Sequence, residues 1–261
     1  MRRSLASACF AALMMAALAP ETGHAQAQLP RLTPPPAAPI KPFKSIAVTP
    51  PAPFNDPSFA AFRKTLGDIA ERKDRAGLAK LVVSQGFFWV QDKDYADKRK
   101  SGIDNLAKAV DLDAKGGGGW DVLAGFATEP TASALAQHKD IVCAPADPTL
   151  NTQDFEDVAK STDTDPSDWG YPTKPGLEVR AAAQPNAPVV ETLGMVLVEV
   201  LPDSASQDNA DAPSFLHVAT PSGKSGFVLV DGLVPLGGDQ MCYTKDATGW
   251  KIAGYVGGAN P

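Results

Sequence analysis

The sequence predicts an α+β protein with a helix-rich N-terminal part, a small β-barrel and a C-terminal β-hairpin. Apolar residues recur at steps of three and four after residue 54, which is typical of helices. Short β-rich runs separated by Pro, Gly, Asn and Asp fill residues 176–235, and two further runs flank a polar turn near the C-terminus. The predicted divisions are a signal peptide at 1–27, a proline-rich linker at 28–53, a helix-rich region at 54–170, the barrel at 171–237 and the hairpin at 238–261.

The first 27 residues predict a cleavable secretory signal peptide. Arg2 and Arg3 give a positive start, an uncharged apolar run extends from Ser4 to Ala19, and Ala25-Gln26-Ala27 offers small side chains for cleavage after Ala27. The run is shorter than the roughly 20 apolar residues that span a bilayer, so we expect no membrane span in the mature form. The predicted location is therefore periplasmic or secreted.

The charge balance of the mature chain is acidic. The full sequence has 24 Lys and Arg against 30 Asp and Glu. Removing two arginines and one glutamate with the signal peptide leaves 22 against 29, a net charge of −7. An acidic chain without a basic block is a poor partner for nucleic acid or for an anionic membrane surface, and we expect neither.

Cysteine usage fits an oxidising compartment. Removal of the signal peptide discards Cys9 and leaves Cys143 and Cys242, an even number that predicts one disulfide. Two buried, unpaired thiols are the alternative. A catalytic cysteine is a third reading, but the spacing of His138 and Cys143 matches no nucleophile signature.

The segment 28–53 is rich in proline and poor in large apolar residues. It holds nine prolines, a composition that favours an extended polyproline II conformation without a core of its own. We expect a spacer, with a recognition motif for a proline-binding partner as the alternative.

Helices are predicted from residue 55 onward. Asn55-Asp56-Pro57 is a helix start, and the apolar residues from Phe59 to Ile69 form one helical face. Further helices or helical turns are expected at 74–83, 101–112, 120–126 and 132–138, while 86–90 is either a strand or the buried end of a loop.

Five short strands with tight turns predict the barrel, at 177–180, 189–193, 196–201, 215–218 and 226–230. The C-terminal hairpin has strands at 240–245 and 250–256. We expect the hairpin to pack on the helical region, tied there by a bond between Cys143 and Cys242.

Residues 176–235 resemble a bacterial SH3-like (SH3b) domain, over less than a quarter of the chain. The opening strand is matched by Leu177-x-Val179-Arg180, and the hydrophobic pair that follows it by Val190 and Leu193. The aromatic strand is matched by Phe215 and Val218. The turn is matched by Ser222-Gly223-Lys224 and the closing strand by Gly226-Phe227-Val228. The sequence departs from the family pattern at Glu178, at Ala181-Ala182-Ala183 and in an acidic insert at 202–213. The resemblance implies a module that binds cell-wall peptides or targets a partner.

The resemblance places a candidate ligand-binding surface on the strands and turns of the barrel. Its residues are Arg180, Phe215, His217, Lys224 and Phe227. For the two phenylalanines the alternative is a place in the core.

Motifs that suggest other chemistry fail on their spacing. Gly223-Lys224-Ser225 lacks the glycine of a phosphate loop, because Val218 stands at that position. The acidic run 163–168 has Asp168 where a calcium loop needs glycine. His138 and His217 have no metal-ligand spacing. We therefore expect no cofactor and no metal site.

Possible catalytic carboxylates are best explained as solvated charges. Glu71 with Asp74, and Asp92 with Asp94, lie in charged runs. The sequence predicts a non-enzymatic binding or scaffold protein whose SH3-like barrel contacts peptidoglycan peptides or an envelope protein. A cell-wall hydrolase or its accessory subunit is the alternative.

Overall fold

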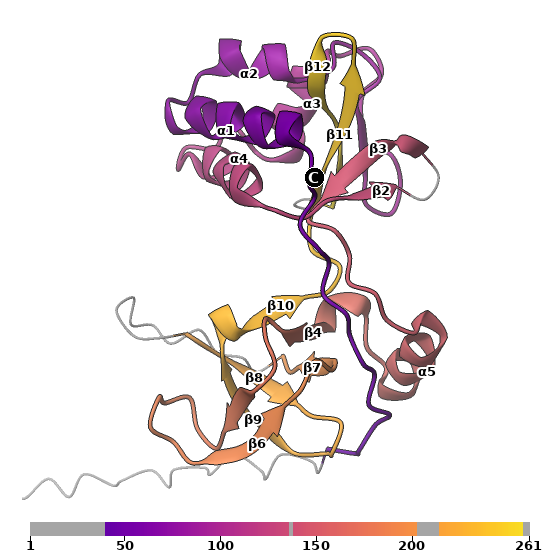
Figure 1. Ribbon diagram of the computed structural model, residues 1–261, viewed down its shortest axis with the longest axis vertical. Coiled ribbons are helices and arrows are strands. Elements are labelled where there is room, and N and C mark those ends of the chain that lie inside the picture. Colours follow the sequence, from indigo (N-terminus) through magenta and orange to yellow (C-terminus); the bar gives the residue numbers. More distant parts are fainter. Residues whose placement is uncertain (1–39, 136–137, 203–213, 258–261) are drawn as a thin grey trace, which may run out of the picture. The chain divides into compact units, whose positions relative to one another are not determined.

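The computed structural model describes residues 40–135, 138–202 and 214–257, and these residues form an α+β fold with two sheets (Figure 1). The predicted fold class is confirmed. The predicted signal peptide lies outside the described residues. None of the helices in the described ranges has the length and apolar character needed to cross a membrane.

The first sheet has five strands and includes the C-terminal hairpin. Its order is β1 (Phe88–Val90), β12 (Gly249–Val256), β11 (Gln240–Asp246), β3 (His138–Ala144) and β2 (Ser133–Leu135). Only β1 and β12 pair in parallel; the other neighbours are antiparallel. The run 86–90, for which strand and loop were both open, therefore contains a strand.

Four helices pack with this sheet. They are α1 (Pro57–Glu71), α2 (Arg75–Leu81), α3 (Gly102–Ala109) and α4 (Gly118–Thr128). As the sequence predicts, α1 begins after Asp56, whose side chain accepts hydrogen bonds from the backbone N–H groups of Ser58 and Phe59. The apolar face of α1 and the side chains of Met241, Tyr243, Ile252 and Tyr255 from the hairpin belong to one buried core.

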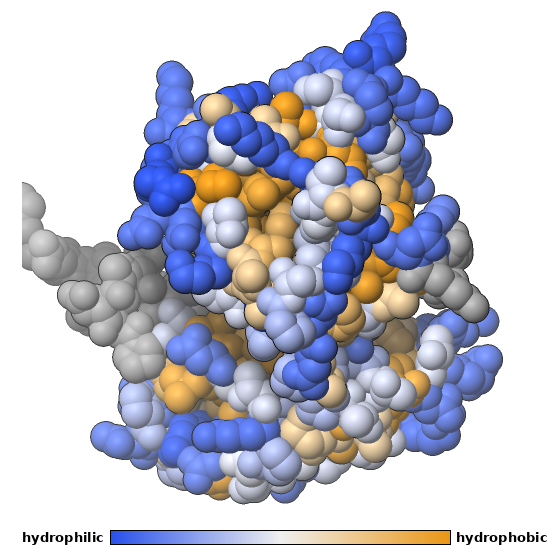
Figure 2. Space-filling view, turned by 45° about the horizontal axis from the view of Figure 1, so that its top comes forward, coloured by the Kyte–Doolittle hydropathy of each residue, from blue (hydrophilic) through white to orange (hydrophobic). Residues whose placement is uncertain are grey.

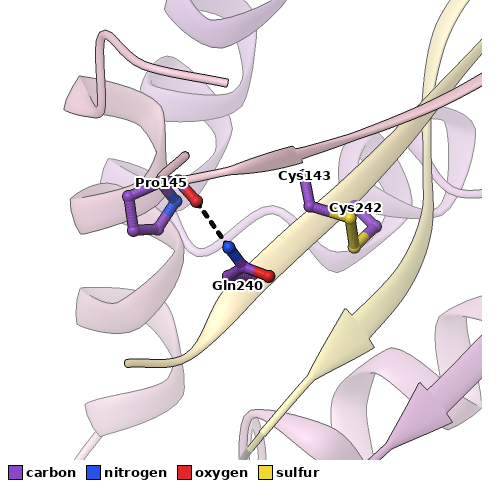
Figure 3. Close-up of a disulfide and its surroundings, with 4 residues drawn as sticks. All are labelled: Cys143, Pro145, Gln240 and Cys242. Carbon is purple, nitrogen blue, oxygen red and sulfur yellow. Dashed lines mark hydrogen bonds between the residues drawn. A yellow bond between two sulfur atoms is a disulfide. The ribbon is translucent and has the colours of Figure 1, made fainter. Parts of the chain in front are cut away.

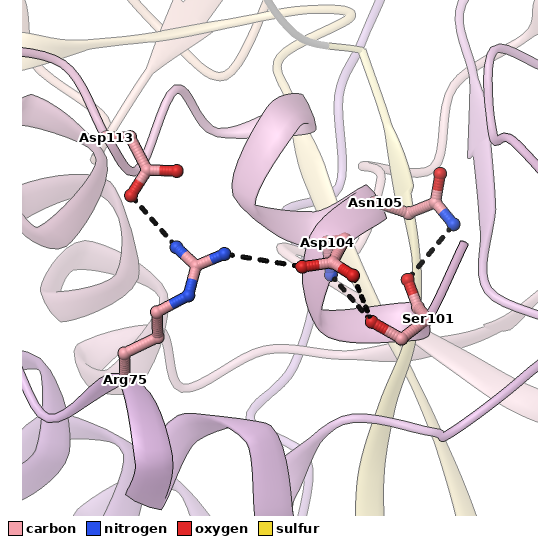
Figure 4. Close-up of polar contacts among 5 residues, drawn as sticks. All are labelled: Arg75, Ser101, Asp104, Asn105 and Asp113. Atoms are coloured by element: carbon pink, nitrogen blue, oxygen red, sulfur yellow. Dashed lines mark hydrogen bonds and ion pairs between the residues drawn. The ribbon is translucent and has the colours of Figure 1, made fainter.

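Surface charges connect α2 with α3 and the loop that follows it (Figure 4). The Arg75 guanidinium lies 2.9 Å from the Asp113 carboxylate and 3.4 Å from that of Asp104. Ser101 caps α3 by accepting from the Asp104 N–H. All three members of the charge cluster are exposed, so the cluster contributes little to stability.

The prediction of a helical turn at 132–138 is wrong. The segment contains β2 and the first residue of β3. Ala134 lies opposite Val142, and β3 pairs in turn with β11. Pairing with β3, which is held on its other side by β11 from the distant C-terminus, overrides the local helical pattern.

The second sheet has seven strands. Its order is β10 (Leu233–Pro235), β4 (Trp169–Pro172), β7 (Val198–Val200), β8 (Phe215–Ala219), β9 (Ser225–Leu229), β5 (Leu177–Arg180) and β6 (Val189–Leu193). Two short 3-10 turns, η1 (Pro166–Asp168) and η2 (Val230–Gly232), precede β4 and β10. The five expected strands are present at these places, within two residues at each end.

The closed barrel is not confirmed. The strand order leaves β10 and β6 as edges, and no closed barrel forms among the described residues. The order also contains two strands that the sequence pattern did not predict, because β10 pairs with β4 and β4 pairs with β7.

Two buried clusters accompany the second sheet. One consists of aliphatic side chains from its strands, such as Val179, Val218 and Val228, all with no exposed area. The other surrounds Trp169 and includes Phe155 and Val158 of α5 (Thr152–Thr162). The predicted helix-rich region 54–170 thus contributes to both parts of the fold, since α5 and β4 pack with the second sheet.

The spacer prediction differs from the structure for residues 40–53, while 28–39 lie outside the described residues. Ile46 and Val48 are buried beside Trp169, whose ring meets the Phe43 ring edge-on at 5.1 Å. Isolated bridges join this segment to later residues, as between Thr49 and Thr149. A few apolar side chains between the prolines are enough to anchor the segment to the core.

The predicted disulfide is confirmed, and it joins two neighbouring strands (Figure 3). Cys143 of β3 lies directly opposite Cys242 of β11, with a Cα–Cα distance of 4.0 Å. Nearby, the Gln240 side-chain amide donates to the Pro145 carbonyl at 2.8 Å. The bond closes a loop that contains α5 and the whole second sheet.

Candidate functional site

Three of the five candidate residues form a row across the second sheet. His217 of β8 lies opposite Phe227 of β9, and Phe227 lies opposite Arg180 of β5. Their neighbours Val218, Val228 and Val179 are fully buried. Because successive side chains of a strand point to opposite faces, the row faces away from this aliphatic core. We call it the outer row.

The outer row is held in place by stacking and hydrogen bonds. The His217 and Phe227 rings are nearly parallel, at 13°, with centroids 4.7 Å apart. Arg180 donates to the Ala187 carbonyl at 2.8 Å and forms an ion pair with the Glu178 carboxylate. Because both terminal nitrogens of the guanidinium are held in this way, the row presents a preorganised surface of aromatic and guanidinium groups.

Phe215 occupies the wall of a small pocket beside the outer row. Its side chain is buried, in agreement with the core alternative, although it shares a sheet face with His217 two residues later. The pocket has a volume of about 210 Å³. It is lined by Thr173, Lys174, Gly176, Leu177, Glu178, Arg180, Phe215, Leu229 and Gly232. This volume is below the ~300 Å³ typical of small-molecule sites, so the pocket suits a single side chain.

Lys224 lies outside the outer row. It follows the turn between β8 and β9, donates to the Val190 carbonyl at 3.3 Å and lies 3.9 Å from the Glu191 carboxylate. Glu191 also accepts hydrogen bonds from the hydroxyls of Thr220 and Ser222. The lysine therefore belongs to a polar cluster that connects the turn with β6.

Two residues of this face were not among the candidates. Glu178 pairs with Arg180, and Leu229 is an exposed hydrophobic residue that lines the pocket. The alternation at 177–180 already places Glu178 and Arg180 on one strand face, so Glu178 could have been found from sequence. The same alternation places Leu229 on the face of Phe227, and its pairing opposite Phe215 brings it to the pocket.

Hydrophobic residues reach the surface in patches bordered by hydrophilic ones in the view of Figure 2. The large hydrophobic residues exposed in the described ranges are Val90, Val122, Val189, Leu229 and Val230. Single exposed apolar residues are ordinary in folded proteins. Leu229 differs from the others in lining the pocket beside the outer row.

Three of the four acidic residues considered as carboxylate pairs make structural hydrogen bonds, and the fourth, Glu71, is exposed. Asp74 caps α2, and Asp94 accepts from the backbone N–H of Trp89. The Tyr95 hydroxyl donates to Asp92 at 2.6 Å, and this hydrogen bond lowers the pKa of the Asp92 carboxyl. Within the described part of the chain, no group of three or more His, Cys, Asp or Glu side chains is arranged to hold a metal ion.

No protein-family model, curated protein or solved structure matches the chain. The resemblance of residues 176–235 to SH3-like bacterial domains therefore stays a prediction from the motifs, and the function has to be argued from the geometry of the site.

Proposed function

We propose that the protein is a non-enzymatic binding or scaffold module of the periplasm or cell exterior, and that the outer row contacts peptides of peptidoglycan or of an envelope protein. The observation that carries this proposal is the alignment of His217, Phe227 and Arg180 across three neighbouring strands. Aromatic and arginine side chains dominate the binding energy of many interfaces.

The chemistry of the outer row suits a peptide. The stacked rings offer apolar area, the guanidinium can donate to a carboxylate or a carbonyl, and the pocket beside Phe215 can take one apolar side chain. The disulfide and the predicted signal peptide support a location in an oxidising compartment, where wall peptides and envelope proteins are found.

Co-sedimentation of the mature chain 28–261 with purified peptidoglycan sacculi tests the proposal. We expect the wild-type protein to pellet and the variant R180A/F227A to bind at least tenfold more weakly. R99A is the control, because Arg99 is an exposed arginine of the helical region that, among the described residues, forms an ion pair only with Asp97 two residues away. Sacculi stripped of their stem peptides should not retain the protein.

Each contrary result has a defined meaning. Equal binding of the wild type and R180A/F227A would remove the outer row from the proposal. Lack of pelleting would exclude the wall ligand and leave an envelope protein, to be identified by crosslinking from a residue introduced at Leu229. A cleared band on a gel containing sacculi would overturn the non-enzymatic assignment and favour the hydrolase alternative.

A further inference from the structure

A second, larger pocket lies within the compact unit formed by residues 39–261. Its volume is about 400 Å³, within the range of small-molecule sites. Six prolines contribute to its wall, namely Pro50, Pro51, Pro130, Pro145, Pro148 and Pro235. Proline has a fixed φ and no backbone N–H, so these residues provide rigid surface without hydrogen-bond donors. We call this the proline pocket.

Hydrogen bonds between distant segments hold the wall together. Thr49 and Thr149 exchange two backbone hydrogen bonds of 2.9 Å each, next to prolines of the wall. The Gln240 amide donates to the Pro145 carbonyl at 2.8 Å. The Ala146 N–H donates to the Thr131 hydroxyl at 3.0 Å. The pocket is thus built into the fold and does not depend on one loop.

Tyr171 of β4 brings a largely buried side chain to the wall of this pocket, with a hydroxyl unpaired among the described residues. The residue is only 5% exposed and is fixed in the sheet opposite Val234. Its hydroxyl neither donates nor accepts a hydrogen bond within the described residues, and the residue lines a cavity large enough for a ligand. A hydroxyl that has no protein partner in the described residues has its donor and acceptor capacity available for a molecule in the cavity.

Two carboxylates line the same pocket. Glu129 uses its Oε1 atom to accept from the N–H and the hydroxyl of Thr131, which leaves Oε2 without a hydrogen bond in the described part of the chain. Asp147 is exposed and makes no hydrogen bond or ion pair with a described residue. Burial, with added effects of these two charges, raises the pKa of Tyr171 and keeps its hydroxyl protonated.

The lining contains no basic residue. The Arg63 guanidinium contacts one lining residue, and it donates to the backbone carbonyl of Glu129 rather than to the carboxylate. The proline pocket therefore combines two negative charges and a neutral hydroxyl with apolar walls. This combination complements a cation that carries an apolar chain.

We propose that the proline pocket binds an alkylammonium group, such as the side chain of a lysine-like residue. An ammonium group has three donors, and Glu129, Asp147 and Tyr171 supply three acceptors. The methylene chain would lie against the prolines and against Val234 and Leu236, which line the same pocket. A hydrated metal ion would gain nothing from these apolar walls.

The proline pocket is separate from the site of the proposed function, because it shares only Thr173 with the pocket beside the outer row.

Binding is to be measured by calorimetry on the mature chain 28–261 with Nα-acetyl-lysine amide. The neutral comparison is Nα-acetyl-norleucine amide. We expect saturable 1:1 binding of the lysine derivative, at least tenfold tighter than that of the norleucine derivative.

Two variants locate the site. D147N and Y171F should each weaken binding of the lysine derivative at least tenfold, while R180A/F227A should not change it. Y171F should keep the wild-type melting temperature, because the hydroxyl has no described hydrogen bond to lose. D121N is the matched control, since Asp121 is an exposed carboxylate on α4 that does not line the pocket.

Three results would overturn the inference. They are lack of binding at 10 mM ligand, equal affinity for the two amides, and wild-type affinity in both D147N and Y171F. Calcium chloride that displaces the lysine derivative at a concentration below that of the derivative itself would assign the pocket to a metal ion. This result would equally refute the alkylammonium proposal.

Discussion

Removal of the bond between Cys143 and Cys242 should cause a large loss of stability. The two cysteines are 99 residues apart. In the chain-entropy model, a loop of 99 residues restricts the unfolded chain by ~16 cal/mol/K, which corresponds to about 4.7 kcal/mol at 25 °C. Because domains are commonly stable by about 5–15 kcal/mol, the variant C143A/C242A should lose a third or more of its free energy of unfolding.

Urea unfolding at equilibrium measures this loss. The wild type, the reduced wild type and C143A/C242A are to be compared under one condition, with the free energy of unfolding taken from midpoint and slope. The reduced wild type separates the bond from the packing of the cysteine side chains, which are nearly or fully buried. The slope should rise in both proteins without the bond, because their unfolded chains expose more surface.

A loss below about 2 kcal/mol in the reduced wild type would refute this reasoning, because the chain-entropy model requires more than twice that amount. Such a result would mean that the second sheet stays folded while the first opens. The part of the chain between Ala144 and Met241 would then keep its ends close without the bond, and the unfolded state would have little entropy left to gain.

Three further predictions concern packing, the N-terminal segment and pH. G254A should cost about 1–3 kcal/mol, because a Cβ atom at Gly254 would overlap the Phe88 ring, and the cost should shrink in F88A/G254A. I46A should cost about 2–5 kcal/mol, because Ile46 is 3% exposed beside Trp169. Hydrogen bonds, first that of the Ser58 hydroxyl, lower the pKa of Asp56 from 3.8 to about 2, so its charge stabilises the fold above pH 3.8 and less as the pH falls toward 2.

Urea unfolding measures the free energy of unfolding of the G254A and I46A variants. If the losses of F88A and G254A simply add in F88A/G254A, the overlap with the Phe88 ring is excluded as the cause. K41A, at an exposed position of the same N-terminal segment, should leave stability unchanged, whereas an equally small effect of I46A would restore the spacer interpretation. For Asp56, the difference in thermal midpoint between the wild type and D56N should shrink from pH 5 to pH 2; a constant difference would contradict the charge argument.

Local patterns in the sequence determined much of the secondary structure. The capping residue before a proline fixed the start of α1, and apolar periodicity separated helices from strands. The count of cysteines and the predicted compartment were enough to predict the disulfide. These features depend on neighbours in sequence or on composition, which is why no tertiary information was needed for them.

Contacts between distant segments decided the rest. The strand within 132–138 pairs with β3, whose other side is held by the distant β11, and residues 40–53 joined the core because a few apolar side chains fit beside Trp169. Strand register aligned three candidate residues in the outer row and left Lys224 in another cluster.

The proline pocket shows most clearly that a site built from distant segments cannot be predicted from local sequence patterns. Glu129, Asp147 and Tyr171 lie on different segments, and none of them belongs to a motif. Local preferences act over a few residues along the chain. Sheet edges, strand neighbours and pockets are set by which distant surfaces bury each other, and that is decided only when the whole chain folds.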